Sequence, residues 1–157
     1  MPTAEGQWKE EIGSPIKGAL VPLEEISDTV FASGAMGPGI AIVPEEGKVY
    51  APENGRVSML FDTLHAIGFA TEKGAELLIH VGMDTVKLEG KFFTAHTETG
   101  AQVKKGDLLL EFDMEKIKDA GYDLTTPVIV TNGDELGEIL PEGPGKVEPG
   151  SKILGIR

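Results

Sequence analysis

The sequence contains no cysteine among its 157 residues. Disulfide bonds, thiolate nucleophiles and cysteine-bound zinc or iron–sulfur centres are therefore excluded. It also lacks an apolar run near the roughly 18 residues that a transmembrane helix needs, and it shows no export signal. We therefore expect a cytoplasmic protein with no direct membrane insertion.

Basic residues are also scarce. Fourteen Lys and Arg stand against 26 Asp and Glu, which gives a formal net charge of −12. This charge argues against nucleic acid or an anionic membrane surface as a direct partner, because both would be repelled. It is compatible with docking onto basic protein surfaces.

Glycine and proline, by contrast, are plentiful. Twenty-one Gly and ten Pro separate many short runs rich in Val, Ile and Leu, which is typical of all-β proteins with many turns. Two irregular repeats, 14–23 with 51–60 and 103–109 with 147–153, suggest a duplicated hairpin motif. The sequence thus predicts an antiparallel, barrel-like β-sandwich with one or two short helical turns.

Helical signals are few. In residues 113–120, Asp113 offers an N-cap, acidic residues come early, lysines come late, and Gly121 follows as a stop signal. A second short turn could form at 22–26. Residues 1–12 are polar and indicate a flexible lead-in, and we expect residues 13–157 to form a single domain.

Two of the three histidines flank a short turn signal. His65 and His80 lie in runs that predict strands, and residues 71–75 between them predict the turn of a β-hairpin. Opposite residues in an antiparallel hairpin have numbers with a constant sum. A turn centred on Glu72 and Lys73 makes that sum 145, which pairs the two histidines. Their Cβ atoms would then lie roughly 4.5–5.5 Å apart.

The turn also permits a second register. Gly74 could take the left-handed position of a three-residue loop with a bulge, which shifts the pairing by one residue and sets His65 opposite Val81. The histidines would then lie on different faces unless a second bulge restored them. We prefer the first register. It places on one face Leu77, Ile79, Val81, Ala66, Gly68 and Ala70, and on the other His65, Ile67, Phe69, Leu78 and His80.

A facing pair of histidines can perform chemistry that a lone ring cannot. A neutral imidazole is a good nucleophile towards phosphorus and can carry a covalent intermediate. The phosphoryl group needs hydrogen-bond donors, which the second imidazole supplies, and the Thr63 hydroxyl can fix the tautomer of that imidazole. Phosphoryl transfer needs mainly positioning and charge stabilisation, so a small site can suffice.

The same residues permit rival interpretations. His65, His80 and Asp84 could form a metal site of two histidines and one carboxylate, although nothing in the spacing requires a metal. We expect no metal with a physiological role at this site, although zinc could bind adventitiously to the two histidines. A hydrolase triad is disfavoured, because the Gly-x-Ser-x-Gly motif is absent and no serine lies near either histidine. His96 lacks a polar constellation around it, which favours a structural role.

The motifs around the histidines resemble those of a known family. Residues 77–86 (LLIHVGMDTV), 65–68 (HAIG), 30–32 (VFA) and 125–129 (TTPVI) are similar to the sugar-specific IIA domains of the bacterial phosphoenolpyruvate-dependent phosphotransferase system, in the glucose and β-glucoside group. The resemblance extends from residue 14 to the final strand. It implies an antiparallel β-sandwich and a phosphotransferase component of sugar transport, an enzyme that works through a covalent phosphohistidine and without a cofactor.

The resemblance also implies roles for individual residues. His80 would accept a phosphoryl group on Nε2 from the histidine-containing phosphocarrier protein and pass it to a cysteine of a IIB domain. His65 would steady the group, with Thr63 hydrogen-bonded to it, and the carbonyl of Gly82 would hold the His80 ring. The partner-binding residues would be the acids Asp28 and Asp84, which match residues that meet arginines, and the apolar Val30, Phe31, Met36 and Phe61.

Some features depart from the glucose-type pattern. Met83 conservatively replaces the usual isoleucine. Ala35 and Met36 replace a bulkier pair found in some members, so regulatory protein targets such as glycerol kinase are not assured. Residues 91–96 and 121–127 look more like domains of β-glucoside, sucrose and trehalose permeases, which are often part of a larger membrane protein. We expect either a free-standing domain or one that is peripheral to or fused with a permease.

A carrier domain is a further alternative. Residues 51–57 and 100–108 are also similar to biotinyl and lipoyl carrier domains, which need a lysine displayed on a tight turn. Here Lys116 lies in the predicted helix. We interpret this likeness as shared architecture.

Overall fold

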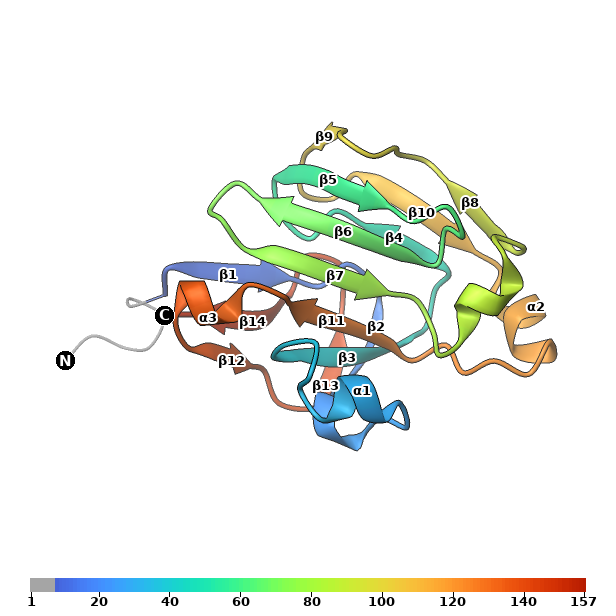
Figure 1. Ribbon diagram of the computed structural model, residues 1–157, viewed down its shortest axis with the longest axis horizontal. Coiled ribbons are helices and arrows are strands. Elements are labelled where there is room, and N and C mark those ends of the chain that lie inside the picture. Colours follow the sequence, from blue (N-terminus) through green and yellow to red (C-terminus); the bar gives the residue numbers. More distant parts are fainter. Residues whose placement is uncertain (1–7) are drawn as a thin grey trace.

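The computed structural model describes residues 8–157, which fold mostly into strands (Figure 1). The strands are β1 (Glu10–Gly13), β2 (Gly18–Pro22), β3 (Gly39–Pro44), β4 (Lys48–Tyr50), β5 (Gly55–Leu60), β6 (Ala66–Thr71), β7 (Glu76–His80), β8 (Phe93–Ala95), β9 (Gln102–Val103), β10 (Leu108–Phe112), β11 (Thr126–Val130), β12 (Ile139–Pro141), β13 (Gly145–Val147) and β14 (Lys152–Ile156). The helices are α1 (Thr29–Ala32), α2 (Met114–Asp119) and α3 (Gly133–Leu136), and the 3-10 turns are η2 (Leu23–Glu25) and η3 (Thr85–Leu88). The predicted all-β class is confirmed.

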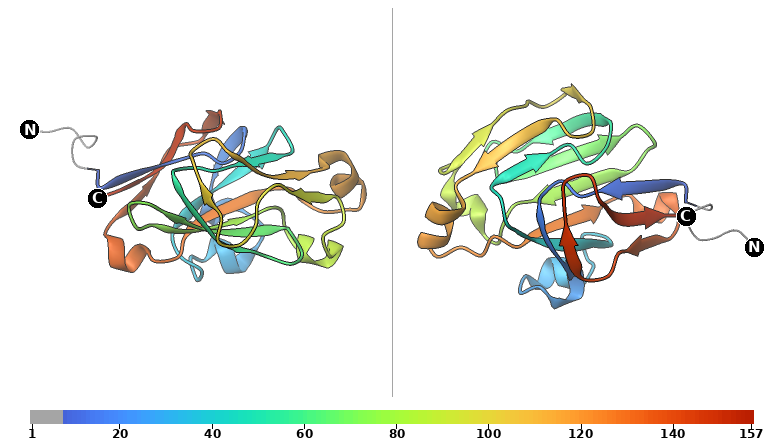
Figure 2. Two further views of the ribbon diagram at one scale, coloured as in Figure 1. Left: turned by 90° about the horizontal axis from the view of Figure 1, so that it is seen from above. Right: turned by 180° about the vertical axis from the view of Figure 1, so that it is seen from behind.

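The strands form one large sheet and two small ones. The large sheet has the order β13-β2-β3-β11-β7-β6-β5-β9, and the small sheets are β1-β14-β12 and β4-β10-β8. Their strand pairs run antiparallel. Views from above and from behind place both small sheets on the same side of the large one (Figure 2). The predicted antiparallel β-sandwich is therefore confirmed.

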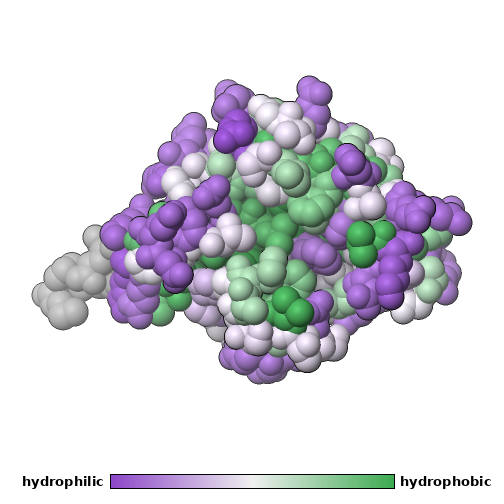
Figure 3. Space-filling view, viewed as in Figure 1, coloured by the Kyte–Doolittle hydropathy of each residue, from purple (hydrophilic) through white to green (hydrophobic). Residues whose placement is uncertain are grey.

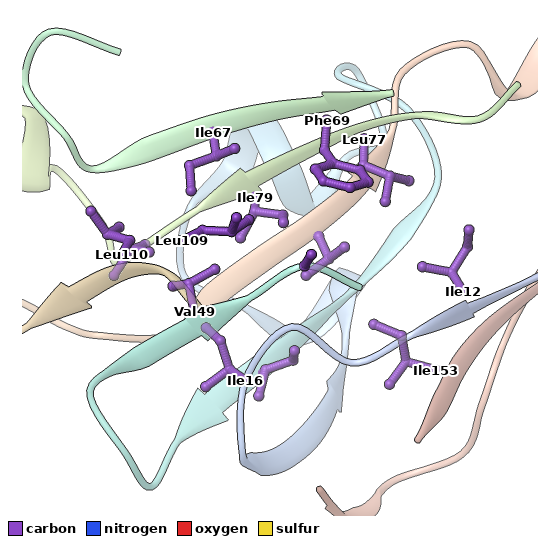
Figure 4. Packing of buried hydrophobic residues seen from close by; sticks show 14 of the residues in the cluster. Ile12, Ile16, Val49, Ile67, Phe69, Leu77, Ile79, Leu109, Leu110 and Ile153 are labelled. Carbon is purple, nitrogen blue, oxygen red and sulfur yellow. The ribbon is translucent and has the colours of Figure 1, made fainter. Parts of the chain in front are cut away.

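A continuous apolar core lies between the sheets. Burial of one large aliphatic or aromatic side chain contributes about 1.5–3 kcal/mol, so a core of this size fixes how the sheets pack. The large sheet contributes Ile67, Phe69, Leu77 and Ile79, and the small sheets contribute Val49, Leu109, Leu110, Ile12 and Ile153, all at most 2% exposed (Figure 4).

The helix predicted at 113–120 is present as α2. Asp113 caps it, because its side chain accepts a hydrogen bond from the backbone N–H of Lys116 at 3.1 Å. The predicted turn at 22–26 is present as η2. Sequence reasoning missed α1, α3 and η3, since elements of four residues are too short to show a helical period. None of the helices in the described part of the chain is long and apolar enough to cross a membrane.

The predicted lead-in of residues 1–12 extends too far into the fold. Residues 1–7 lie outside the described residues, but β1 pairs with β14, with Glu10 opposite Ile156. Ile12 is fully buried in the core. Because this side chain and the backbone pairing are both used, residues 10–12 belong to the sheet and not to a flexible segment.

The preferred register of the β6–β7 hairpin is wrong, and the second register is correct. Ile67 lies opposite Ile79 and Phe69 opposite Leu77, so the residue numbers sum to 146. The N–H of Thr71 donates to the carbonyl of Ala75 at 2.9 Å, which closes a three-residue loop. Gly74 supports this loop with a φ of 110°.

Core packing explains the choice of register. The observed pairing places four large side chains, Ile67, Phe69, Leu77 and Ile79, together in the core. The preferred register would have placed two of them on the face that carries the histidines. Because each buried side chain of this size contributes about 1.5–3 kcal/mol, the three-residue loop is favoured.

Candidate active site

His80 lies at the end of β7, whose side chains alternate between the core and the outer face. Leu77 and Ile79 are buried in the core, and Leu78 and His80 are half-buried. Successive side chains of a strand point to opposite faces. The central strand β7 therefore holds the imidazole of His80 on the outer face of the large sheet.

His65 reaches His80 in spite of the shifted register. Ala66, the first residue of β6, lies opposite His80, so His65 precedes the regular strand. Leu64 before it has a left-handed backbone with a φ of 60°. The alternation of a regular strand therefore does not extend to His65. The two ring centroids lie 4.8 Å apart at an interplanar angle of 82°, so the predicted contact between the rings is present.

Each imidazole has one nitrogen held by a neighbouring oxygen. Nδ1 of His80 donates to the carbonyl oxygen of Gly82 at 2.9 Å, because a carbonyl oxygen can only accept. In the neutral ring the lone pair then lies on Nε2. Nδ1 of His65 lies 2.6 Å from the hydroxyl oxygen of Thr63. The arrangement gives neutral His80 an unprotonated Nε2, which a nucleophilic imidazole requires.

Burial favours the neutral form of both rings. Burial, and secondarily the neighbouring His80, lower the pKa of His65 from 6.5 to about 4. Burial also lowers the pKa of His80, against the opposing effects of the Gly82 carbonyl and of the carboxylates of Asp28 and Asp84. At neutral pH both imidazoles are therefore uncharged.

Aromatic side chains line the two rings. The ring centroid of Phe31 lies 5.1 Å from that of His80, and the centroid of Phe61 lies 5.6 Å from that of His65. Phe31 is only 6% exposed, so it packs on the imidazole and presents little open surface. The resemblance placed Phe31 in an apolar docking patch, but its contact with His80 makes it chiefly a wall of the site.

Exposed apolar side chains occur near these walls. Val30 in α1 is 53% exposed, and Met36, in the loop after α1, is 41% exposed. Apolar residues gather across the middle of the face that carries β5, β6 and β7, between polar margins (Figure 3). This face is therefore less polar than a net charge of −12 alone would suggest.

Two acids influence the site from its edge. Asp28 caps α1, since its Oδ1 accepts from the N–H groups of Val30 at 2.9 Å and Phe31 at 3.3 Å. This cap holds Phe31 against His80. Asp84 lies exposed in the turn after β7, with a left-handed φ of 59°. Both carboxylates act on the pKa of His80, so both lie within its electrostatic reach.

Sequence reasoning missed three residues near the site, which are Val86, Thr85 and Asp123. Val86 in η3 is 47% exposed, and Thr85 beside it is fully buried. Both lie inside the motif of residues 77–86, so that motif could have drawn attention to them. The carbonyl of Asp123 accepts from the N–H of Met83 at 2.8 Å. This backbone contact between distant segments has no sequence signal.

The rival interpretations receive no support from the geometry. Across residues 8–157, no group of three or more His, Asp or Glu side chains is placed to hold a metal ion, so Asp84 does not complete a metal site with the histidines. Lys116 lies in α2 and not on a tight turn. His96, for which we expected no polar partner, bonds to Glu111 through Nε2 and Oε1 at 2.6 Å on the surface.

The fold and the site together define the class of this protein: it is an antiparallel β-sandwich that holds two imidazoles edge to face on its central hairpin. The family model described as phosphoenolpyruvate-dependent sugar phosphotransferase system, EIIA 1, matches residues 10–136. The chain belongs to this family, as the resemblance of its motifs predicted.

Individual relatives agree with this assignment. The chain is 56% identical over 148 residues to a protein named PTS system beta-glucoside-specific EIIBCA component from Halalkalibacterium halodurans, and 52% identical over 148 residues to one of the same name from Bacillus subtilis. Each match covers 94% of this chain but only 23% and 24% of the relative. The chain thus spans about a quarter of the length of these relatives.

A solved structure also matches. The glucose permease IIA from Mycoplasma capricolum has a TM-score of 0.80 and 31% sequence identity with this chain. The match covers 92% of this chain and 94% of that structure. The sandwich is therefore shared with a IIA protein over nearly the whole length of both.

Proposed function

We propose that this chain is a phosphocarrier whose His80 accepts a phosphoryl group from the histidine-containing phosphocarrier protein and passes it to a cysteine of a IIB domain, which drives sugar uptake with phosphorylation. The observation that carries the proposal is the hydrogen bond from Nδ1 of His80 to the Gly82 carbonyl, because it leaves a lone pair on Nε2. A IIB partner is consistent with the names of the relatives, which describe them as EIIBCA components.

In the accepting step, Nε2 of His80 attacks the phosphorus of the phosphohistidine on the donor protein. The new N–P bond forms as the donor's N–P bond breaks, and the donor imidazole leaves with the bonding electron pair. The step needs no general base, since the attacking nitrogen of neutral His80 carries no proton. The Gly82 carbonyl stabilises the positive charge that develops on the ring as Nε2 shares its lone pair.

In the donating step, the thiolate of the IIB cysteine attacks the phosphorus on His80. The S–P bond forms, the Nε2–P bond breaks, and its electron pair returns to Nε2. His65 assists this onward step as a hydrogen-bond donor to the phosphoryl group that His80 carries. When the Thr63 hydroxyl donates to Nδ1 of His65, the neutral ring keeps its proton on Nε2, where it can donate to a phosphoryl oxygen.

The surface around the histidines suits protein partners. Exposed Val30, Met36 and Val86 offer apolar area, and Asp28 and Asp84 offer carboxylates to arginines. The net charge of −12 adds long-range attraction for a basic partner surface. Other regulatory protein targets could use the same surface.

In this role the chain from β1 onward acts as one IIA-type domain. The domain works on the cytoplasmic side, peripheral to a permease or fused with it. The names of the relatives, which join EIIB, C and A in one component, support this placement.

The test is reconstitution of the phosphoryl relay. Phosphoenolpyruvate, the two general phosphotransferase proteins and this chain are incubated together, and intact mass is measured. We expect one acid-labile phosphoryl adduct on the wild-type chain and none on His80→Ala. The surface histidine variant His96→Ala is the matched control and should retain the adduct. An adduct that survives His80→Ala, or no adduct on the wild type, would contradict the proposal.

A further inference from the structure

The turn after β7 carries the carbonyl that holds His80, and it is tied to the fold on two sides. The N–H of Val81 donates to the carbonyl of His65 at 2.7 Å, and the N–H of Met83 donates to the carbonyl of Asp123 at 2.8 Å. Gly82 between them has a φ of 81°, which few residues other than glycine adopt. The direction of the Gly82 carbonyl therefore depends on what packs against this turn.

Thr85 packs against it from inside the protein and is fully buried. Its hydroxyl donates to the carbonyl of Val81, so its polar atom is satisfied within the turn. Its methyl group lies against Gly82, where a Cβ would come within 2.6 Å of Thr85 Cγ2. Thr85 thus holds the peptide unit before Gly82 with its hydroxyl and Gly82 itself with its methyl group.

We infer that Thr85 is a positioning residue for His80, an inference that rests on the proposed function. Thr85 fixes the peptide between Val81 and Gly82, and the hydrogen bond from Met83 to Asp123 holds the next peptide, which contains the Gly82 carbonyl. With both peptides fixed, the Gly82 carbonyl stays aimed at Nδ1 of His80. The hydrogen bond made by one ring nitrogen decides which nitrogen of a neutral histidine carries the proton. When the carbonyl turns away, the proton can move to Nε2, and that tautomer has no lone pair there to attack phosphorus. Thr85 therefore acts on the nucleophile without touching it.

Three variants separate the parts of Thr85. Thr85→Val keeps the shape and removes the hydroxyl, whereas Thr85→Ser keeps the hydroxyl and removes the methyl group. The matched control is Thr71→Val. Thr71 is also buried and its hydroxyl also bonds to the backbone, accepting from the N–H of Ala75 at 3.0 Å. It lies at the opposite end of the β6–β7 hairpin from His80.

The decisive measurement is nitrogen-15 NMR of the His80 ring in the unphosphorylated protein, followed by the rate of phosphoryl acceptance. Wild type, Thr85→Ser and Thr71→Val should keep the proton on Nδ1. Thr85→Val should populate the Nε2 tautomer and accept the phosphoryl group about tenfold more slowly. A merely structural role would lower the melting temperature without changing the tautomer in the folded protein. A wild-type tautomer and rate in Thr85→Val would overturn the inference.

The role of Thr85 can still be tested if Thr85→Val does not fold or if the chain is not phosphorylated. If Thr85→Val does not fold, Thr85→Ala is measured in the same way. This variant removes the hydroxyl without placing a methyl group against the Val81 carbonyl. An unchanged His80 tautomer in Thr85→Ala would overturn the inference. The NMR measurement needs no phosphoryl donor. A wild-type chain that is never phosphorylated would therefore defeat the proposed function, while the tautomer would still decide whether Thr85 orients His80.

Discussion

The imidazoles of His65 and His80 lie edge to face with centroids 4.8 Å apart, although the hairpin pairs His80 with Ala66. The left-handed backbone of Leu64, just before the regular strand, accompanies this contact. The two rings differ in what holds Nδ1: a carbonyl at His80 and a hydroxyl at His65. This asymmetry is the physical basis for giving them different roles.

The first prediction separates these roles. His65→Ala should still accept a phosphoryl group on His80, because the nucleophile and its Gly82 contact remain. Onward transfer should fall about 100-fold, the usual effect of removing one hydrogen-bond donor from a charged transition state. Rapid-quench assays that follow acceptance and donation separately would measure both steps. A His65→Ala variant that fails at acceptance, as His80→Ala should, would show that the roles are not separate.

The second prediction concerns stability at acidic pH. The pKa of His65 is about 4 in the folded protein, against 6.5 for an unperturbed histidine. Between these values the unfolded chain binds more protons than the folded protein, so protonation favours unfolding. The free energy of unfolding should therefore fall as the pH drops below 6.5, with a loss of about 2 kcal/mol at pH 5 from His65. The lowered pKa of His80 acts in the same direction.

Urea denaturation at pH 7.5, 6 and 5 measures this dependence. His65→Gln should be markedly less sensitive to pH than the wild type, because Gln does not titrate. The surface variant His96→Gln is the control and should keep the dependence due to His65. The explanation fails if His65→Gln and the wild type lose the same free energy between pH 7.5 and 5.

The fold was largely predictable from the sequence because its signals are local. Turn residues separate short apolar runs, and Asp113 followed by late lysines indicates α2 directly. The hairpin itself was also predictable, and it brings the ends of its two strands, which carry His65 and His80, into the same region. The contact between the rings was predicted from a register that proved wrong, since His80 pairs with Ala66.

The finer geometry was not predictable, because several of its determinants lie outside local sequence. The segment Glu72-Lys73-Gly74 suits both a two-residue and a three-residue loop, and the packing of Phe69 and its neighbours decides between them. Leucine has no preference for a left-handed backbone, so nothing signals the conformation of Leu64. The backbone contact of Met83 with Asp123 joins residues forty positions apart.

The third prediction compares two glycines with left-handed backbones. Gly74 has a φ of 110° and Gly82 one of 81°. A Cβ at Gly74 would meet nothing within 4 Å, whereas at Gly82 it would lie 2.6 Å from Thr85 Cγ2 and 2.9 Å from the carbonyl of Asp123. Gly74→Ala should therefore cost only backbone strain, about 1–2 kcal/mol. Gly82→Ala should cost about 1–3 kcal/mol more, since the turn must also move.

Chemical denaturation of the two variants gives this comparison, and the phosphorylation assay adds a second one. Gly82→Ala should also slow phosphoryl acceptance, because the moved turn takes the carbonyl away from His80. Gly74→Ala, at the far end of the hairpin, should accept at the wild-type rate. Equal losses of stability, or equal rates, would show that the close packing around Gly82 does not matter.

The last prediction concerns partner docking. Val30 and Val86 are 53% and 47% exposed on elements that carry residues of the site. Neither side chain is assigned a contact with the phosphoryl group. Val30→Ser and Val86→Ser should therefore each raise the KM for the donor phosphocarrier about five- to tenfold, equivalent to about 1–1.4 kcal/mol of lost contact, with kcat unchanged.

Val43 in β3 is similarly exposed, at 43%, and Val43→Ser is the control that should leave KM unchanged. Steady-state kinetics with the donor as the varied substrate separates these outcomes. A fall in kcat at constant KM would place Val30 or Val86 in the chemical step, and an equal effect of Val43→Ser would remove the case for a specific docking surface.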